Sequence, residues 1–192
     1  MKERREKRKW GLMLFIVMIM VGTSFSVVFF GFSGTSEVVK YNDIKFIKKY
    51  DRWEAKINDK SAAFSFLPAE VENIQDLNAS TKLLQNKFEI DTTYDFNSTY
   101  KEAIALANYQ MGLTLANYHI FIRQGMASNN TFNLPIIKCK DATLQVPVVY
   151  FREGNSTRLY NKDNCIIAEA NSNPDFIRIK DRIVYTILGV IK

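Results

Sequence analysis

The longest apolar stretch of the chain covers residues 10–32 and directly follows a charged segment, residues 1–9. It has no charged side chain, and its polar positions are one threonine and two serines. A helix of this length can cross about 30 Å of hydrocarbon, so the pattern predicts a transmembrane helix. A cleaved signal peptide is the alternative, with Gly31 and Ser33 as small residues before the cut. The stretch exceeds the usual signal-peptide core of roughly 7–15 residues, which favours a retained anchor.

Beyond residue 42 the pattern changes to the alternation that is typical of β-strands. One run over residues 44–50 leads to a turn at residues 51–52, and a second run over residues 53–57 leads to a turn at residues 58–60. A third run places Phe64 and Phe66 on one face. The domain is therefore predicted to open with an antiparallel meander.

The middle of the chain combines a strand with a helix. Phe88 to Tyr94 alternates, which predicts a strand, and the segment Asn97-Ser98-Thr99 offers side-chain oxygens for a helix N-cap. Apolar and small residues then recur at helical spacing from Ala103 to Tyr118, and Gly125 is a candidate stop. We expect this helix to pack closely against a sheet.

The last third is again strand-like and ends in a helix. Leu144 to Phe151 forms a β-branched and aromatic run, Glu153-Gly154-Asn155 forms a turn, and residues 158–160 with 165–168 form a returning ladder. The closing helix is predicted from Asn173 to Gly189. Its apolar stripe is expected to face the core, and its charged residues are expected to face water: Arg178, Lys180, Asp181 and Arg182.

These patterns together predict a cytoplasmic basic tail (residues 1–9), a transmembrane helix (10–32), a linker (33–42) and one extracytoplasmic domain (43–192). The fold class is α+β: an N-terminal transmembrane helix, then a mainly antiparallel sheet with two principal packed helices.

Charge argues against nucleic acid as a partner. The net charge is +6, but residues 1–9 hold six cations against two acids, so the remaining chain carries only +2. Its lysines are interleaved with acids, which leaves no phosphate-binding footprint. The predicted partners are instead the lipid bilayer, through residues 10–32, and a protein or glycan at the cell surface.

Three features predict that the domain lies outside. The cationic flank precedes the apolar stretch, which places the tail in the cytoplasm. Four glycosylation sequons follow it, and their acceptors are Asn78, Asn97, Asn129 and Asn155. Cys139 and Cys165 are an even pair, as expected where disulfides persist, and we expect them to bond. In that hypothesis the strand from Leu144 pairs with the returning strand through the turn at Gly154.

Candidate chemistry is sparse. His119 is the single histidine, which excludes multi-histidine metal sites, and a histidine at a helix C-terminus accounts for it without catalysis. Asp91 and Asp95 flank a strand-to-helix junction, but four strand residues separate carboxylates by about 13 Å. The glycines are scattered, so no phosphate loop is predicted. We expect no metal and no cofactor, and we carry Asp91, Asp95 and His119 as one polar site.

Four tyrosines fall on or beside the central helix: Tyr94, Tyr100, Tyr109 and Tyr118. An exposed tyrosine cluster is typical of a protein or glycan interface. Packing into the core accounts for the same pattern, so both interpretations stay open.

Parts of the chain resemble two known groups of proteins. The segment Asn164-Cys165-Ile166-Ile167, with Asp175, Asp181-Arg182 and Leu188-Gly189-Val190-Ile191, resembles the ending of uncharacterised, N-terminally anchored archaeal surface proteins. That resemblance implies a small extracytoplasmic domain and no activity. The run Val146 to Phe151, with Gly154 and the helix from Asp175, resembles thioredoxin-like folds, but the chain has no Cys-x-x-Cys motif and so lacks their redox chemistry.

Two functional hypotheses follow. The first is a binding or interaction module at the cell surface. The alternative is an extracytoplasmic enzyme, or a thioredoxin-like domain without the redox motif. A pocket that gathers Asp91, Asp95 and His119 would favour the enzyme, whereas dispersal of these residues would favour the module.

Overall fold

A computed structural model describes residues 10, 13–22 and 37–191 of the chain. The chain divides into two compact units, Met1–Glu37 and Val38–Lys192. The predicted basic tail and residues 33–36 of the predicted linker lie outside the described residues.

The predicted transmembrane helix is contradicted. Across residues 10, 13–22 and 37–191, no helix is long and apolar enough to cross a membrane. Residues 13–22 are helical. Residues 11–12 and 23–32 of the predicted span lie outside the described residues.

The second unit opens with the predicted antiparallel meander. Its four strands pair in chain order: β1 (Val38–Tyr41), β2 (Ile44–Lys49), β3 (Arg52–Ile57) and β4 (Lys60–Phe64). The turns between them use residues with positive φ, which Asn and Asp tolerate well: Asn42, Tyr50, Asn58 and Asp59. β1 lies within residues 33–42, the predicted linker, because Val38-Val39 is itself a good strand sequence.

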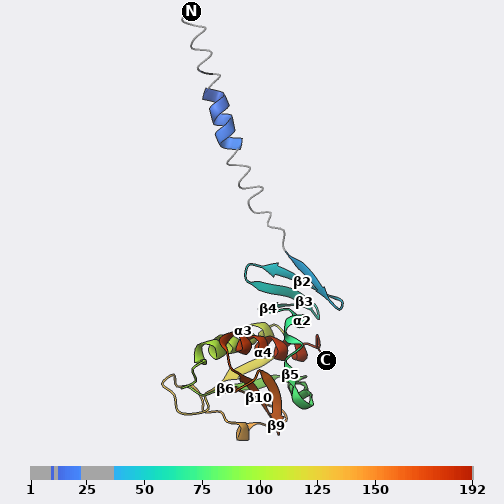
Figure 1. Ribbon diagram of the computed structural model, residues 1–192, viewed down its shortest axis with the longest axis vertical. Helices are drawn as coiled ribbons and strands as arrows, with labels where there is room; N and C mark the ends of the chain where they lie inside the picture. Colours follow the sequence, from blue (N-terminus) through green and yellow to red (C-terminus); the bar gives the residue numbers. More distant parts are fainter. Residues whose placement is uncertain (1–9, 11–12, 23–36, 192) are drawn as a thin grey trace, which may run out of the picture. The chain divides into compact units, whose positions relative to one another are not determined.

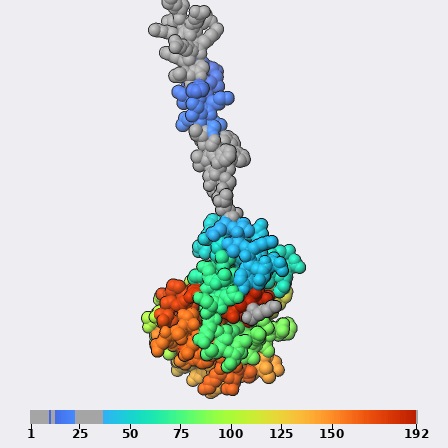
Figure 2. Space-filling model, turned by 45° about the vertical axis from the view of Figure 1, so that its right-hand side comes forward, coloured from blue at the N-terminus to red at the C-terminus, as the bar shows by residue number. Residues whose placement is uncertain are grey.

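A short connection leads from this first sheet to the second. It consists of α2 (Pro68–Val71), β5 (Gln75–Asp76) and the 3-10 segment η1 (Leu77–Leu84). Figure 2 shows it in green, between the first sheet in blue and the C-terminal third in orange and red. Within η1, Asn78 and Ala79 have positive φ, which breaks the helical run into two turns.

The second sheet has six strands in the order β5-β9-β10-β8-β6-β7. Its further elements are β6 (Glu89–Tyr94), α3 (Lys101–Ala116), β7 (Phe121–Gln124), η2 (Cys139–Asp141), β8 (Val148–Glu153), β9 (Arg158–Lys162), β10 (Cys165–Ala170) and α4 (Asn173–Ile187). The fold is α+β, and α3 and α4 are its two principal helices (Figure 1). β7 follows α3 where the sequence predicted that the helix would continue toward Gly125.

The second sheet is mixed, so the prediction of a mainly antiparallel sheet holds only for the first. β9 and β10 form the predicted antiparallel ladder. β8, however, pairs in parallel with β6 and with β10, and it does not pair with β9 through the turn at Gly154. The first four residues of β8 are buried or half-buried on both faces, which is the pattern of a central parallel strand.

Both helices lie between the two sheets (Figure 1). Phe64 of the first sheet stacks on Tyr185 of α4 at 4.0 Å between ring centroids. Phe176 of α4 contacts Phe151 of the second sheet at 6.5 Å. α4 is therefore apolar toward both sheets, and the core spans three layers.

This central position overturns one prediction about α4. Lys180, Asp181 and Arg182 were expected to face water, but they are only 2%, 0% and 7% exposed. The prediction assumed one covered face, whereas α4 is covered by the first sheet, by the second sheet and by α3.

Candidate functional site

Asp91, the first residue of the predicted polar site, has a local partner. It lies on β6, is 2% exposed, and accepts hydrogen bonds from Arg123 of β7. Arg123 Nε donates to one carboxylate oxygen at 2.7 Å, and Nη2 donates to the other at 2.6 Å. This bidentate pair occupies both oxygens and joins neighbouring strands, so Asp91 has a structural role.

Asp95 and His119 lie at opposite ends of β6. Asp95 directly follows the strand, and its Oδ1 accepts the backbone N–H of Asn97 at 2.9 Å. His119 is exposed, with a φ of 60°, in the turn that precedes β7. Because Phe121 pairs with Glu89, this turn lies at the amino end of β6. The structure therefore does not bring Asp91, Asp95 and His119 together.

The arrangement of the second sheet points to a different place. From β6 the chain runs through α3 to β7 on one side, whereas from β8 it runs to β9 and β10 on the other side. The carboxyl ends of β6 and β8 are thus a topological switch point, where open α/β sheets form their ligand crevices. A cavity of about 360 Å³ lies there, lined by Asp95, Asn97, Ser98, Tyr150, Phe151, Arg152 and Glu153.

A second cavity of about 250 Å³ shares Tyr150 with the first and is lined also by Thr93, Ala127, Ile137, Lys138 and Cys139. Thr93 pairs with Tyr150 across β6 and β8, so both lie on the sheet face opposite the helices. We call these two cavities, which share Tyr150, the outer groove. Burial, and then the negative charge of Asp95, raise the pKa of the half-buried Tyr150 hydroxyl.

An ion network fixes the end of the outer groove nearest the switch point. Glu169 of β10 is 2% exposed and accepts hydrogen bonds or ion pairs from Arg152 at 2.7 Å and from Arg158 at 2.6 Å. Burial opposes its ionisation, but the two arginines outweigh burial and lower the pKa of Glu169. Hydrogen bonds from Ser98 Oγ and from the Thr99 backbone N–H likewise lower the pKa of Glu153.

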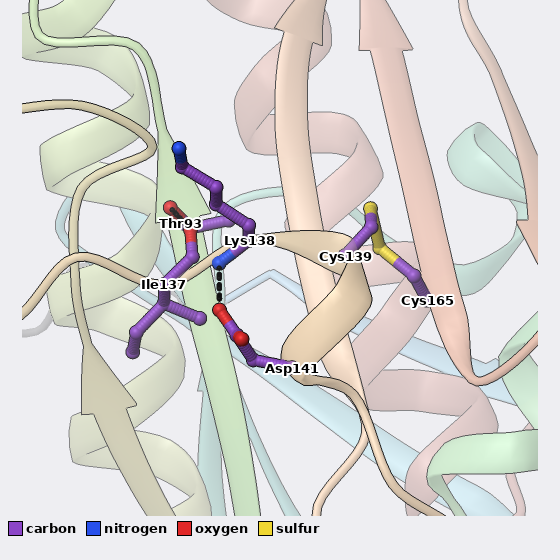
Figure 3. The surroundings of a disulfide bond; sticks show 6 residues. All are labelled: Thr93, Ile137, Lys138, Cys139, Asp141 and Cys165. Atoms are coloured by element: carbon purple, nitrogen blue, oxygen red, sulfur yellow. Dashed lines mark hydrogen bonds between the residues drawn. A yellow bond between two sulfur atoms is a disulfide. The ribbon is translucent and has the colours of Figure 1, made fainter.

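The disulfide fixes the other end. Cys139 of η2 and Cys165 of β10 are bonded, with 5.1 Å between their Cα atoms, so the structure contains the predicted pair (Figure 3). The expected hairpin is not the cause: Cys165 pairs with Val148 in parallel, and the loop that carries Cys139 folds back over the sheet. Thr93 Oγ1 adds a hydrogen bond of 2.8 Å to the Ile137 carbonyl of that loop.

η2 itself is held by a local bond. The Lys138 backbone N–H donates to Asp141 Oδ2 at 2.9 Å, which closes a capping box around the turn. In Figure 3 the Lys138 side chain extends toward β6, away from the disulfide. Lys138 therefore presents its charge to the outer groove.

The four sequon asparagines are all exposed: Asn78, Asn97, Asn129 and Asn155. Asn97 is the one of them that lines the outer groove. In the first sequon Ser80 is buried and donates a hydrogen bond to Asp76, so that hydroxyl has a structural role.

The four tyrosines do not form an exposed cluster. Tyr94 is buried, Tyr100 donates to the Asn171 carbonyl, and Tyr118 donates to the Ile57 carbonyl. Tyr109 alone among the four is largely exposed, at 63%. Core packing thus accounts for most of them.

Sequence reasoning missed Tyr150 and Arg152. Their strand was recognised, but their role depends on the carboxyl ends of β6 and β8 lying side by side. The signal was the unbroken run Val148-Val149-Tyr150-Phe151, which is typical of a central parallel strand.

Across residues 10, 13–22 and 37–191, no three His, Cys, Asp or Glu side chains are placed to hold a metal ion. Comparison of the chain with protein-family models, with curated proteins and with solved structures finds no match.

Proposed function

We propose that Val38–Ile191 forms a binding module that acts outside the cytoplasm, and that its partner docks in the outer groove. The observation that carries this proposal is the groove at the switch point, with half-buried Tyr150 between charged ends. Sites of this kind combine an apolar surface with a few fixed polar groups.

The dispersal of Asp91, Asp95 and His119 favours binding over catalysis by these residues. Asp91 is occupied by Arg123, and His119 lies at the far end of β6. The groove itself is held by ion pairs and by the disulfide, which suits a preformed binding surface that orders little on association.

The groove fits an extended segment of another protein. Lys138 lies at one end, Asp95, Arg152 and Glu153 lie at the other, and Tyr150 separates them. Tyrosine and arginine are the residues that most often dominate protein interfaces. The spacing of both charge signs around an aromatic centre suits a polar peptide of mixed charge.

The disulfide and the exposed sequon asparagines support an extracytoplasmic location. The resemblance of the C-terminal residues to anchored archaeal surface proteins agrees with it.

Photo-crosslinking tests the groove. We would place p-benzoylphenylalanine at Lys138, which lines the groove, or at Lys140, which is exposed on the same loop and does not line it. Each full-length protein is irradiated with a membrane extract of the native cells. We expect a discrete protein adduct from position 138 and none from position 140.

A blocking variant provides the second arm of the test. Asn97→Arg would fill the groove and abolish the adduct, whereas Asn155→Arg, at an exposed position outside it, would leave the adduct unchanged. Equal adducts from positions 138 and 140, or an adduct that survives Asn97→Arg, would contradict the proposal. Capture of a glycan alone would contradict the choice of a protein partner.

A further inference from the structure

A separate pocket of about 270 Å³ lies between the first sheet and the two helices. Its wall on the sheet side comes from β3, β4 and the residue after β4, and its other wall comes from α3 and α4. We call it the Lys180 pocket; it is lined by Arg52, Glu54, Ser61, Ala63, Phe64, Ser65, Gln110, Leu113, Thr114, Asn117 and Lys180. It shares no residue with the outer groove.

A buried ammonium lies at the floor of this pocket. Lys180 lines the pocket and yet is only 2% exposed. Within the described part of the chain, its Nζ has one hydrogen-bond partner, Asp181. An ammonium has three N–H donors, so two remain for the pocket, and buried donors without an acceptor are costly.

Three of the roughly four acceptor positions of the Asp181 carboxylate are occupied. Its Oδ2 accepts the backbone N–H groups of Ser65 and Phe66, each at 2.9 Å, and its Oδ1 accepts Lys180. The carboxylate therefore fixes Lys180 in place through one of its three N–H donors.

The other polar groups of the pocket are largely occupied. Thr114 Oγ1 donates to the Ala63 carbonyl at 3.2 Å, and Asn117 donates to the Ser61 carbonyl at 3.0 Å. Both side chains bind carbonyl groups of β4, an edge strand of the first sheet, and so join the α3 wall of the pocket to its sheet wall. Within the described residues, Lys180 is the buried cation of the pocket with unused N–H donors, and the amide N–H groups of Gln110 on α3 also have no hydrogen-bond partner.

Ion pairs border the pocket and leave a small positive excess. Lys180 pairs with Asp181, and Glu54 pairs with Arg52 at 3.4 Å and with Lys49 at 2.7 Å, so three cations face two acids. Leu113 and Ala63 add an apolar side. A ligand that fits must therefore supply a negatively charged acceptor at one end and an apolar body at the other.

We propose that the Lys180 pocket binds a small organic carboxylate, which accepts the two free N–H donors of Lys180 and packs its apolar part against Leu113 and Ala63. A charged acceptor suits this donor better than a neutral carbonyl, because charge-assisted hydrogen bonds are roughly twice as strong as neutral ones. The volume suits a ligand of amino-acid or sugar-acid size.

A pair of probes that differ only in charge tests this. Benzoate and benzamide have nearly the same shape, and each is titrated into the ¹⁵N-labelled full-length chain. The reporters are the backbone N–H signals of Ser65 and Phe66 and the side-chain amide signals of Gln110 and Asn117. We expect benzoate to shift all four and to bind at least tenfold more tightly than benzamide.

Matched variants test whether benzoate binds beside the Lys180 ammonium. Leu113→Glu puts a carboxylate at the pocket and is expected to weaken benzoate binding at least fivefold. Leu106→Glu changes the same residue type on the same helix, is exposed and does not line the pocket, so binding should not change. Lys180→Met should abolish the preference for benzoate, and its melting temperature shows whether the fold survives.

Several outcomes would overturn the proposal. These are equal affinity for benzamide, no shift of the four reporters at 50 mM benzoate, an unchanged affinity in Leu113→Glu, or equal losses in Leu113→Glu and Leu106→Glu. Because the two sites share no residue, failure here leaves the crosslinking result at Lys138 intact, and the reverse also holds.

Discussion

At the scale of single residues, the position of the Glu169 side chain requires a glycine at position 154. A Cβ at this position would lie 2.3 Å from Cγ of Glu169, and Glu169 cannot move away easily because Arg152 and Arg158 hold it. Gly154 thus lets the chain just after β8 pass close to Glu169 and its two arginine partners.

Gly154→Ala is therefore expected to lower the free energy of unfolding by about 1–3 kcal/mol through overpacking. Gly112→Ala is the control: its Cβ would meet nothing nearer than 3.9 Å, and a helical Gly-to-Ala change should raise stability by roughly 1 kcal/mol. Urea unfolding of both variants measures the difference. Equal effects of the two substitutions would show that Glu169 is not fixed.

The same carboxylate predicts a dependence on pH. The pKa of Glu169 is lowered in the folded state, so its stabilising effect is complete above its unfolded pKa of about 4.3 and is lost as pH falls through the lower folded value. Between about pH 5 and pH 2, wild type should lose more stability than Glu169→Gln. Parallel losses in urea titrations at each pH would contradict this.

At the scale of elements, the sequence predicted turns and pairings between adjacent strands, but it did not predict pairings between strands far apart in the chain. The turns at Asn58 and Asp59 and the ladder of β9 with β10 were predictable, because adjacent segments carry the signal. The parallel pairing of β8 with β6 joins residues across α3, β7 and a long loop, and no local spacing encodes it. β7 was missed because Phe121–Gln124 is short and follows α3 after a turn of only four residues, 117–120.

The candidate site was less predictable than the fold for the same reason. Cys139 and Cys165 could be paired by elimination, since the chain has two cysteines. Tyr150 becomes a site residue only when two parallel strand ends meet, and Lys180 becomes buried only when the first sheet also covers α4. Both facts depend on tertiary contacts, which override the amphipathic pattern of one helix.

The disulfide yields a prediction about the loop over the sheet. Its cysteines are 26 residues apart, and a loop of that length should contribute about 3 kcal/mol through the unfolded chain. The double variant Cys139→Ser/Cys165→Ser should lose roughly this much in denaturant unfolding. Denatured, unreduced wild type should take up no alkylating label; two labels per chain would contradict the bond.

At the scale of the whole molecule, the proposed location is tested by labelling intact cells with a membrane-impermeant amine reagent. Lys45 and Lys56 are exposed on the first sheet, and we expect both to be modified before lysis. A cytoplasmic protein from the same cells serves as the control and should stay unlabelled. Modification of Lys45 and Lys56 only after lysis would contradict the location.

The stacking of Tyr185 on Phe64 also implies that the first sheet is synthesised well before the helix that covers it. The hairpins of that sheet can close within about 1–10 μs of emerging, but the Tyr185 hydroxyl reaches the Phe66 carbonyl across 119 residues of sequence. At roughly 5–20 residues per second, that interval takes about 6–24 s. Because Phe46 and Phe64 pack on Tyr185 in the folded chain, we expect them to stay uncovered during this interval, which leaves an apolar sheet surface exposed on the nascent chain.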